Sequence, residues 1–117
     1  SLDGFLRRWR APRAGDRDFA VKVVVPVTSP RGAAEAIWVA LDKERNGAFQ
    51  GRYANDPFRI ENAEIGDPVV FSKARIIDWQ FFAGDTLNGA YTTRVLMPNL
   101  SPEARKRLEG SLAPLPN

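Results

Sequence analysis

The dipeptide Asn46-Gly47 constrains the fold of this chain most, because Asn-Gly between two β-rich segments is the strongest short signal for a β-hairpin. Residues 34–41 lead into the turn, and in residues 48–54 aromatic side chains alternate with polar or small ones. The alanines of the first segment would also suit a helix, but the turn that follows favours a strand. We therefore predict one strand in each segment.

Several other segments have the composition of strands. The valine-rich segment 19–27 is predicted to be a strand whose end lies at an edge or a bulge, because Pro26 cannot donate a ladder hydrogen bond. Further strands are expected at residues 69–71, 75–82 and 87–97, the last two joined by a turn at 83–85.

Helices are predicted near the two ends of the sequence. Four apolar residues have the i, i+3, i+4, i+7 spacing of an amphipathic helix, namely Leu2, Phe5, Leu6 and Trp9. Pro12 ends this helix. Ser101 and Pro102 are typical of the N-cap and the first position of a second helix.

Consecutive strands between two helices predict an α+β fold with a mainly antiparallel, strongly curved sheet, for which a barrel-like closure is the alternative. A length of 117 residues fits a single domain over residues 1–117. No apolar run approaches the roughly 20 residues of a membrane span, so no membrane span is expected.

The composition narrows the chemistry that this chain can perform. It has no cysteine and no histidine, which excludes thiolate catalysis and removes the commonest general base and the commonest transition-metal ligand. An enzyme built on this chain would have to use carboxylates, lysine, tyrosine or hydroxyl groups. We expect no metal site and no cofactor. Whether the protein is an enzyme is left open, and we favour a non-enzymatic function.

The net charge of +3 is unevenly distributed, because residues 1–31 carry seven Lys or Arg and three Asp or Glu. One interpretation is an anionic partner, or a first helix that lies on a membrane surface. The interpretation that we favour is a solvated charged face on a helix that covers the sheet. Basic residues are not interleaved with the aromatic ones, so no nucleic-acid partner is expected.

The first candidate functional residues are Asp78 and Trp79, followed by Tyr91 and Arg94 on the next predicted strand. Strand alternation would place Asp78 on one face, and Trp79 with Ile77 on the core face. If the two strands pair, Asp78 and Arg94 become plausible cross-strand partners, either as an ion pair or as part of a carboxylate or phosphate site. For Asp78 itself, the functional interpretation is binding of a cationic group or general-base catalysis. The interpretation that we favour is a structural role, in which its carboxylate accepts hydrogen bonds from a neighbouring loop.

Two further candidates lie earlier in the chain. Asn55 belongs to Asn55-Asp56-Pro57, which is either a turn or a loop that faces a ligand, and we favour the turn. Trp38 precedes the hairpin. The candidate binding residues are therefore Trp38, Asn55, Asp78, Trp79, Tyr91 and Arg94, with no catalytic residue assigned.

Six short motifs run through nearly the whole chain, at residues 18–23, 37–39, 51–57, 66–69, 77–79 and 89–94. Together they resemble the uncharacterised bacterial family "domain of unknown function 2314". The resemblance implies a small α+β domain and favours a periplasmic or secreted location over a cytoplasmic one. Where the family has a histidine before the Ile37-Trp38 motif, this chain has Ala36, so a role for that histidine does not carry over.

These observations lead to three hypotheses of function. The first is a non-enzymatic bacterial binding module for a protein or a small ligand, because a motif-rich sheet occurs without histidine or cysteine. The second is an immunity-type protein that neutralises a toxin. The third is a histidine-free enzyme that uses Asp78 and Arg94.

Overall fold

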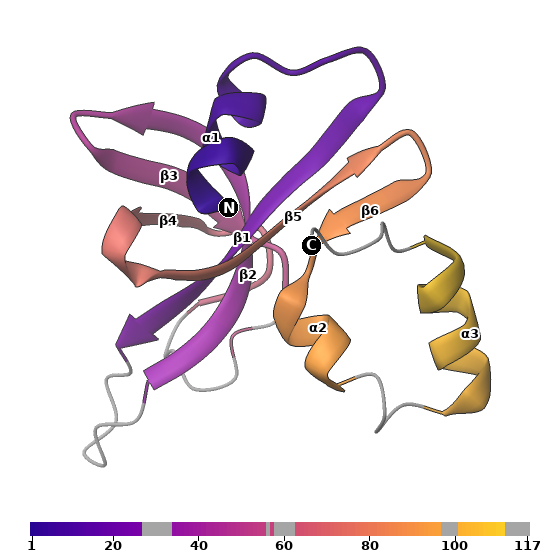
Figure 1. Cartoon of the computed structure of the whole chain (residues 1–117). Helices are drawn as coiled ribbons and strands as arrows, with labels where there is room; N and C mark the ends of the chain where they lie inside the picture. The colour runs from indigo at the N-terminus through magenta and orange to yellow at the C-terminus, as the bar shows by residue number, and fades with distance from the viewer. Residues whose placement is uncertain (27–33, 56, 58–62, 97–100, 112–117) are drawn as a thin grey trace. The chain divides into compact units, whose positions relative to one another are not determined.

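The computed structural model describes residues 1–26, 34–55, 57, 63–96 and 101–111 (Figure 1). The elements are α1 (Leu2–Arg10), β1 (Asp16–Pro26), β2 (Ala34–Arg45), β3 (Ala48–Tyr53), β4 (Pro68–Ser72), the 3-10 helix η1 (Lys73–Arg75), β5 (Ile76–Ala83), β6 (Thr86–Gly89), α2 (Tyr91–Leu96) and α3 (Pro102–Ser111). The strands form a six-stranded sheet in the order β4-β3-β2-β1-β5-β6. Each strand pair whose register is described is antiparallel.

This architecture confirms the predicted α+β class, the antiparallel sheet and the helices near both ends. The barrel-like alternative is not supported, because the strand order leaves β4 and β6 at two ends and the sheet is not closed. The strong curvature of the sheet stays a prediction. None of the described helices is long and apolar enough to cross a membrane.

The chain divides into two compact units. The terminal unit combines Ser1–Phe19 with Asp78–Asn117, and the central unit is Ala20–Ile77. The prediction of a single domain over residues 1–117 stays a prediction. The sequence also predicts a turn at residues 28–32 and a crossover segment at residues 58–63. The turn lies outside the described residues, as does all of the crossover segment except Ala63.

The central unit owes its core to side chains that alternate along β1 and β2. Val21 pairs with Val39, and Val23 pairs with Ile37. All four side chains are at most 2% exposed, as expected when every second residue of a strand points to one face. The predicted hairpin is confirmed, since Asn46-Gly47 has φ of 52° and 81° and joins β2 to β3, which fits the two left-handed residues of a type I′ turn.

The terminal unit is held together by aromatic packing against α1. Phe5 and Leu6 are buried, and the Phe5 ring lies 5.2 Å from the ring of Trp79 and 5.7 Å from that of Phe19. Ser1 accepts a hydrogen bond from the Gly4 N–H and caps the helix. Because part of the apolar stripe of α1 is packed inside the protein, the structure favours a helix that covers the sheet over a membrane-surface helix.

The prediction of one long strand over 87–97 is wrong. β6 ends at Gly89, and the chain continues as α2 from Tyr91. Gly89 and Ala90 have φ of 82° and 55°, and two successive left-handed residues cannot continue a strand. Tyr91 and Arg94 therefore lie on a helix.

Candidate anion-binding pocket

Asp78 is a buried carboxylate that fixes the start of α2. It is 3% exposed, and its oxygens accept hydrogen bonds from the N–H groups of Trp79 at 2.8 Å, Tyr91 at 3.1 Å and Thr92 at 2.7 Å. The Thr92 hydroxyl donates a fourth bond at 2.7 Å. From β5, the Asp78 carboxylate thus caps the free N–H groups at the start of α2, which agrees with the structural role that the sequence analysis favours.

The prediction of which β5 side chains face the core is partly wrong. Ile77, expected in the core, is 52% exposed, because it is Asp78 that the strand presents to the start of α2. Asp78 and Arg94 do not form the expected cross-strand pair. Arg94 lies on α2, and its Nε donates to the Gly89 carbonyl oxygen at 2.7 Å.

The structure places the six candidate residues in two groups. Tyr91 packs edge-on against Trp79 in the terminal unit, with ring centroids 5.6 Å apart. In the central unit, Asn55 accepts a hydrogen bond from the Trp38 N–H at 3.2 Å, and the Ala54 N–H donates to the Trp38 carbonyl at 2.8 Å. Asn55 therefore extends the pairing beyond β3, as a turn residue would. The binding role of these six residues stays a prediction.

A pocket of about 460 Å³ lies in the terminal unit and includes one of them, Trp79. Its wall consists of three arginines, three aromatic residues, one amide and small residues: Ser1, Gly4, Phe5, Arg7, Arg8, Ala11, Arg13, Trp79, Phe81 and Asn88. No carboxylate belongs to this set. The lining is therefore suited to a negatively charged ligand.

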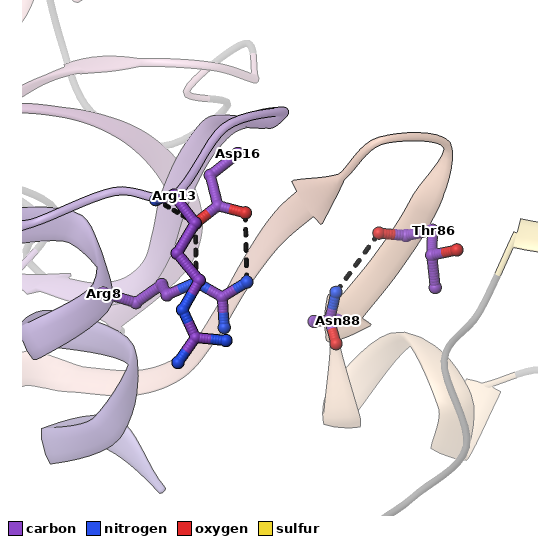
Figure 2. Close-up of polar contacts among 5 residues, drawn as sticks. All are labelled: Arg8, Arg13, Asp16, Thr86 and Asn88. Carbon is purple, nitrogen blue, oxygen red and sulfur yellow. Dashed lines mark hydrogen bonds and ion pairs between the residues drawn. The ribbon is translucent and has the colours of Figure 1, made fainter.

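Arg8 is held in place on two sides. Its Nε and Nη2 donate to the two carboxylate oxygens of Asp16 at 2.6 Å and 3.2 Å (Figure 2). Its guanidinium also lies 5.1 Å from the centre of the Phe81 ring. The Asp16 side chain is 1% exposed and also accepts the Arg13 N–H at 2.9 Å. Asp16 thereby links α1 to the loop that carries Arg13, so that the Arg8 guanidinium and the Arg13 backbone are both held in place.

β6 contributes one residue, Asn88, to the lining of the pocket. Figure 2 shows Asn88, whose Nδ2 donates to the Thr86 carbonyl oxygen at 3.2 Å. This bond orients the side-chain amide, because it engages the amide nitrogen and leaves Oδ1 as a potential acceptor. The pocket thus offers a ligand guanidinium donors, an amide and an aromatic surface. Among the described residues, no three Asp or Glu side chains gather to hold a metal ion.

Sequence reasoning missed most of this site. Arg7 and Arg8 lie off the apolar stripe of α1, where charged residues usually face solvent. The signal that could have found them is the excess of positive charge in residues 1–31, for which an anionic partner was the less favoured interpretation.

Comparison with known proteins identifies the family. Residues 3–112 match the model of a family described as "Uncharacterized protein conserved in bacteria (DUF2314)". The chain belongs to this family. The assignment confirms the resemblance seen in the six motifs of this DUF2314 chain.

A similar curated protein is "Uncharacterized protein YegJ" of Escherichia coli (strain K12), which is 34% identical to the DUF2314 chain over 94 residues. The match covers 80% of the chain and 60% of YegJ, so the chain spans about three fifths of the length of this relative. No solved structure matches the DUF2314 chain.

Acid is expected to weaken the contact between Arg8 and Asp16. The hydrogen bond from Arg8 lowers the pKa of Asp16 below its ordinary value of 3.8, against the raising effect of burial, and the Arg13 N–H lowers it further. A carboxyl whose pKa is lower in the folded state stabilises that state above its unfolded pKa. This contribution is lost as the pH falls below about 3.9 and through the lower folded pKa.

The measurement is an NMR titration of the Asp16 side-chain carboxyl carbon, paired with thermal unfolding between pH 2 and 6. Asp16→Asn is the control, because it removes this titration while keeping the shape of the side chain. Titration of Asp16 at or above its ordinary pKa would contradict the assignment.

Proposed function

We propose that this DUF2314 chain is a non-enzymatic binding module that holds an anionic small ligand in the pocket beside α1. The observation that carries the proposal is the pocket wall, in which Arg7, Arg8 and Arg13 occur with aromatic side chains and without a carboxylate. Arginine binds oxyanions through paired, charge-assisted hydrogen bonds. A volume of about 460 Å³ lies within the range of small-molecule sites.

The geometry supports binding over catalysis by Asp78 and Arg94. All four hydrogen bonds of Asp78 run to α2 and to its own strand, and Arg94 is engaged by a backbone carbonyl. Burial, followed by the charges of Glu35 and Asp67, raises the pKa of Tyr53, so this phenol stays protonated at neutral pH and is a poor base. The histidine-free enzyme is accordingly the weaker hypothesis.

A small ligand is also favoured over a protein partner. The immunity-type hypothesis would use an exposed contact surface, whereas the arginines here line a concave site together with buried Phe5 and Phe81. A periplasmic or secreted location, which the resemblance implied, stays a prediction.

The test is an NMR titration of the protein with sodium phosphate, sodium sulfate and sodium succinate at constant ionic strength. We expect the amide signals of residues 4–13 and 79–88 to shift, with saturation. Replacing Arg7 and Arg13 together by glutamine should weaken binding about tenfold or more, because each charge-assisted hydrogen bond contributes roughly 1.5–3 kcal/mol.

The matched control is Arg75→Gln, which removes an exposed arginine of the central unit. This control should leave the affinity unchanged. The proposal would be refuted if no anion shifted these signals, or if the control variant weakened binding as much as the double variant.

A further inference from the structure

We infer that the ligand of this pocket is a phosphate monoester carried on a flat, aromatic ring. The inference rests on the proposed function and specifies the ligand of the same site. Three features of the terminal unit carry it: the charge balance of the pocket, its aromatic wall and its size.

The charge balance favours a doubly charged anion. Arg7, Arg8 and Arg13 bring three positive charges to the wall, and Asp16, which contacts Arg8 and Arg13, balances one of them. Two positive charges therefore remain for the ligand. A phosphate monoester carries about −1.5 to −2 charges at pH 7 and presents three acceptor oxygens, whereas a carboxylate carries one charge and presents two.

The donors around the pocket fit three oxygens better than two. Arg8 uses Nε and Nη2 to hold Asp16, which leaves Nη1 for a ligand. Arg7 and Arg8 are consecutive residues of α1 and Arg13 lies in the loop after it, so the guanidinium groups of the lining come from two elements. Three guanidinium groups can together bind a phosphate group, which has three acceptor oxygens.

The other wall is suited to a flat ring. Phe5, Trp79 and Phe81 line the pocket, and their rings pack on one another at centroid distances of 5.2 to 6.3 Å. Because Phe5 and Phe81 are buried, Trp79 is the ring most open to a ligand. Trp79 is only partly buried, and its indole N–H donates to none of the described residues. An aromatic ligand gains from stacked or edge-on contact with such rings beyond the area that it buries.

The pocket has room for a ligand larger than a bare anion. A volume of about 460 Å³ would remain mostly empty around inorganic phosphate alone. The free Oδ1 of Asn88 also provides an acceptor for an N–H or O–H group on the body of the ligand.

The experiment compares four probes by calorimetry on the whole chain: phenyl phosphate, cyclohexyl phosphate, benzoate and inorganic phosphate. We expect phenyl phosphate to bind about fivefold or more tightly than cyclohexyl phosphate, which has the same charge but no flat ring. Benzoate and inorganic phosphate should bind more weakly than phenyl phosphate. In NMR spectra, the Trp79 indole N–H signal should shift with phenyl phosphate.

Each contrary outcome has a separate meaning. Equal affinity for the phenyl and cyclohexyl esters would contradict the inferred preference for an aromatic ring. Benzoate binding as tightly as phenyl phosphate would contradict the inferred preference for a phosphate group. Either result would leave anion binding itself intact. Absence of binding by all four probes would refute the proposed function as well. Because the comparison uses the unaltered protein, none of these outcomes depends on whether a Trp79 variant folds.

Discussion

Replacing Gly89 with alanine is expected to destabilise the protein by at least about 3 kcal/mol. Gly89 has a φ of 82°, which side chains other than glycine rarely adopt. A Cβ atom there would overlap the Trp79 carbonyl oxygen and would lie 2.6 Å from Cε3 of the indole ring. Both the backbone and a large ring would have to move. The measurement is urea unfolding followed by tryptophan fluorescence.

Gly47→Ala is the matched control for this substitution. Gly47 has a φ of 81°, but a Cβ atom there would meet nothing within 4 Å. This variant should therefore lose only the backbone preference, roughly 1–2 kcal/mol. The difference between the two variants isolates the overlap with Trp79. Equal losses of stability in the two variants would show that the close packing of Gly89 on Trp79 does not contribute to the free energy of unfolding.

Replacing Asp78 with alanine is expected to cost about 3 kcal/mol or more of stability. The substitution would leave the N–H groups of Tyr91 and Thr92 without their acceptor at the start of α2. An unsatisfied buried polar group costs about 1–3 kcal/mol, and loss of a helix cap costs about 0.5–2 kcal/mol. Asp78→Asn should cost less, because it retains one oxygen acceptor of the same shape.

Unfolding in urea, monitored by circular dichroism, measures both Asp78 variants. Asp85→Ala is the control, because the Asp85 side chain is fully exposed and its oxygen lies 3.9 Å from Arg17 in a surface ion pair. This control should show no measurable change. A stable Asp78→Ala variant would mean that the carboxylate is not needed to hold α2.

The strands of the central unit could be predicted from the sequence because the signals that specify them are local. Val21 and Val23 alternate with less buried neighbours, and Asn46-Gly47 specifies the turn that sets the pairing of β2 with β3. Each of these signals lies within one strand or one turn. No distant contact is needed to interpret them.

The segment after Gly89 could not be predicted in this way. Residues 91–96 include tyrosine, threonine and valine, which favour strands. They form a helix because two left-handed residues turn the chain and because Asp78, a residue of another strand, accepts their free N–H groups. The deciding contact is tertiary, and local propensity does not contain it.

The pocket could not be predicted from the sequence for a related reason. In the sequence, Arg8 looks like an ordinary surface residue of an amphipathic helix. Only the structure shows that it contacts Asp16 and Phe81. Arg7 and Arg13 become candidate ligand-binding residues only because Trp79, far along the chain, lines the same pocket. The excess of positive charge in residues 1–31 indicated an anionic partner as one interpretation. The position of the site, however, depends on which distant residues pack against α1.

The division of the chain into two units also sets an order of assembly. The terminal unit is made from the two ends of the chain, and the whole of Ala20–Ile77 is synthesised between them. Phe5 emerges from the ribosome early but meets Trp79 only after the central strands have followed, and closing so long a loop is slow compared with forming the local β2–β3 hairpin. We therefore expect the arginine-lined pocket to form late in folding. A nascent or shortened chain that ends at Ile77 would carry the arginines of α1 with no site for them to form.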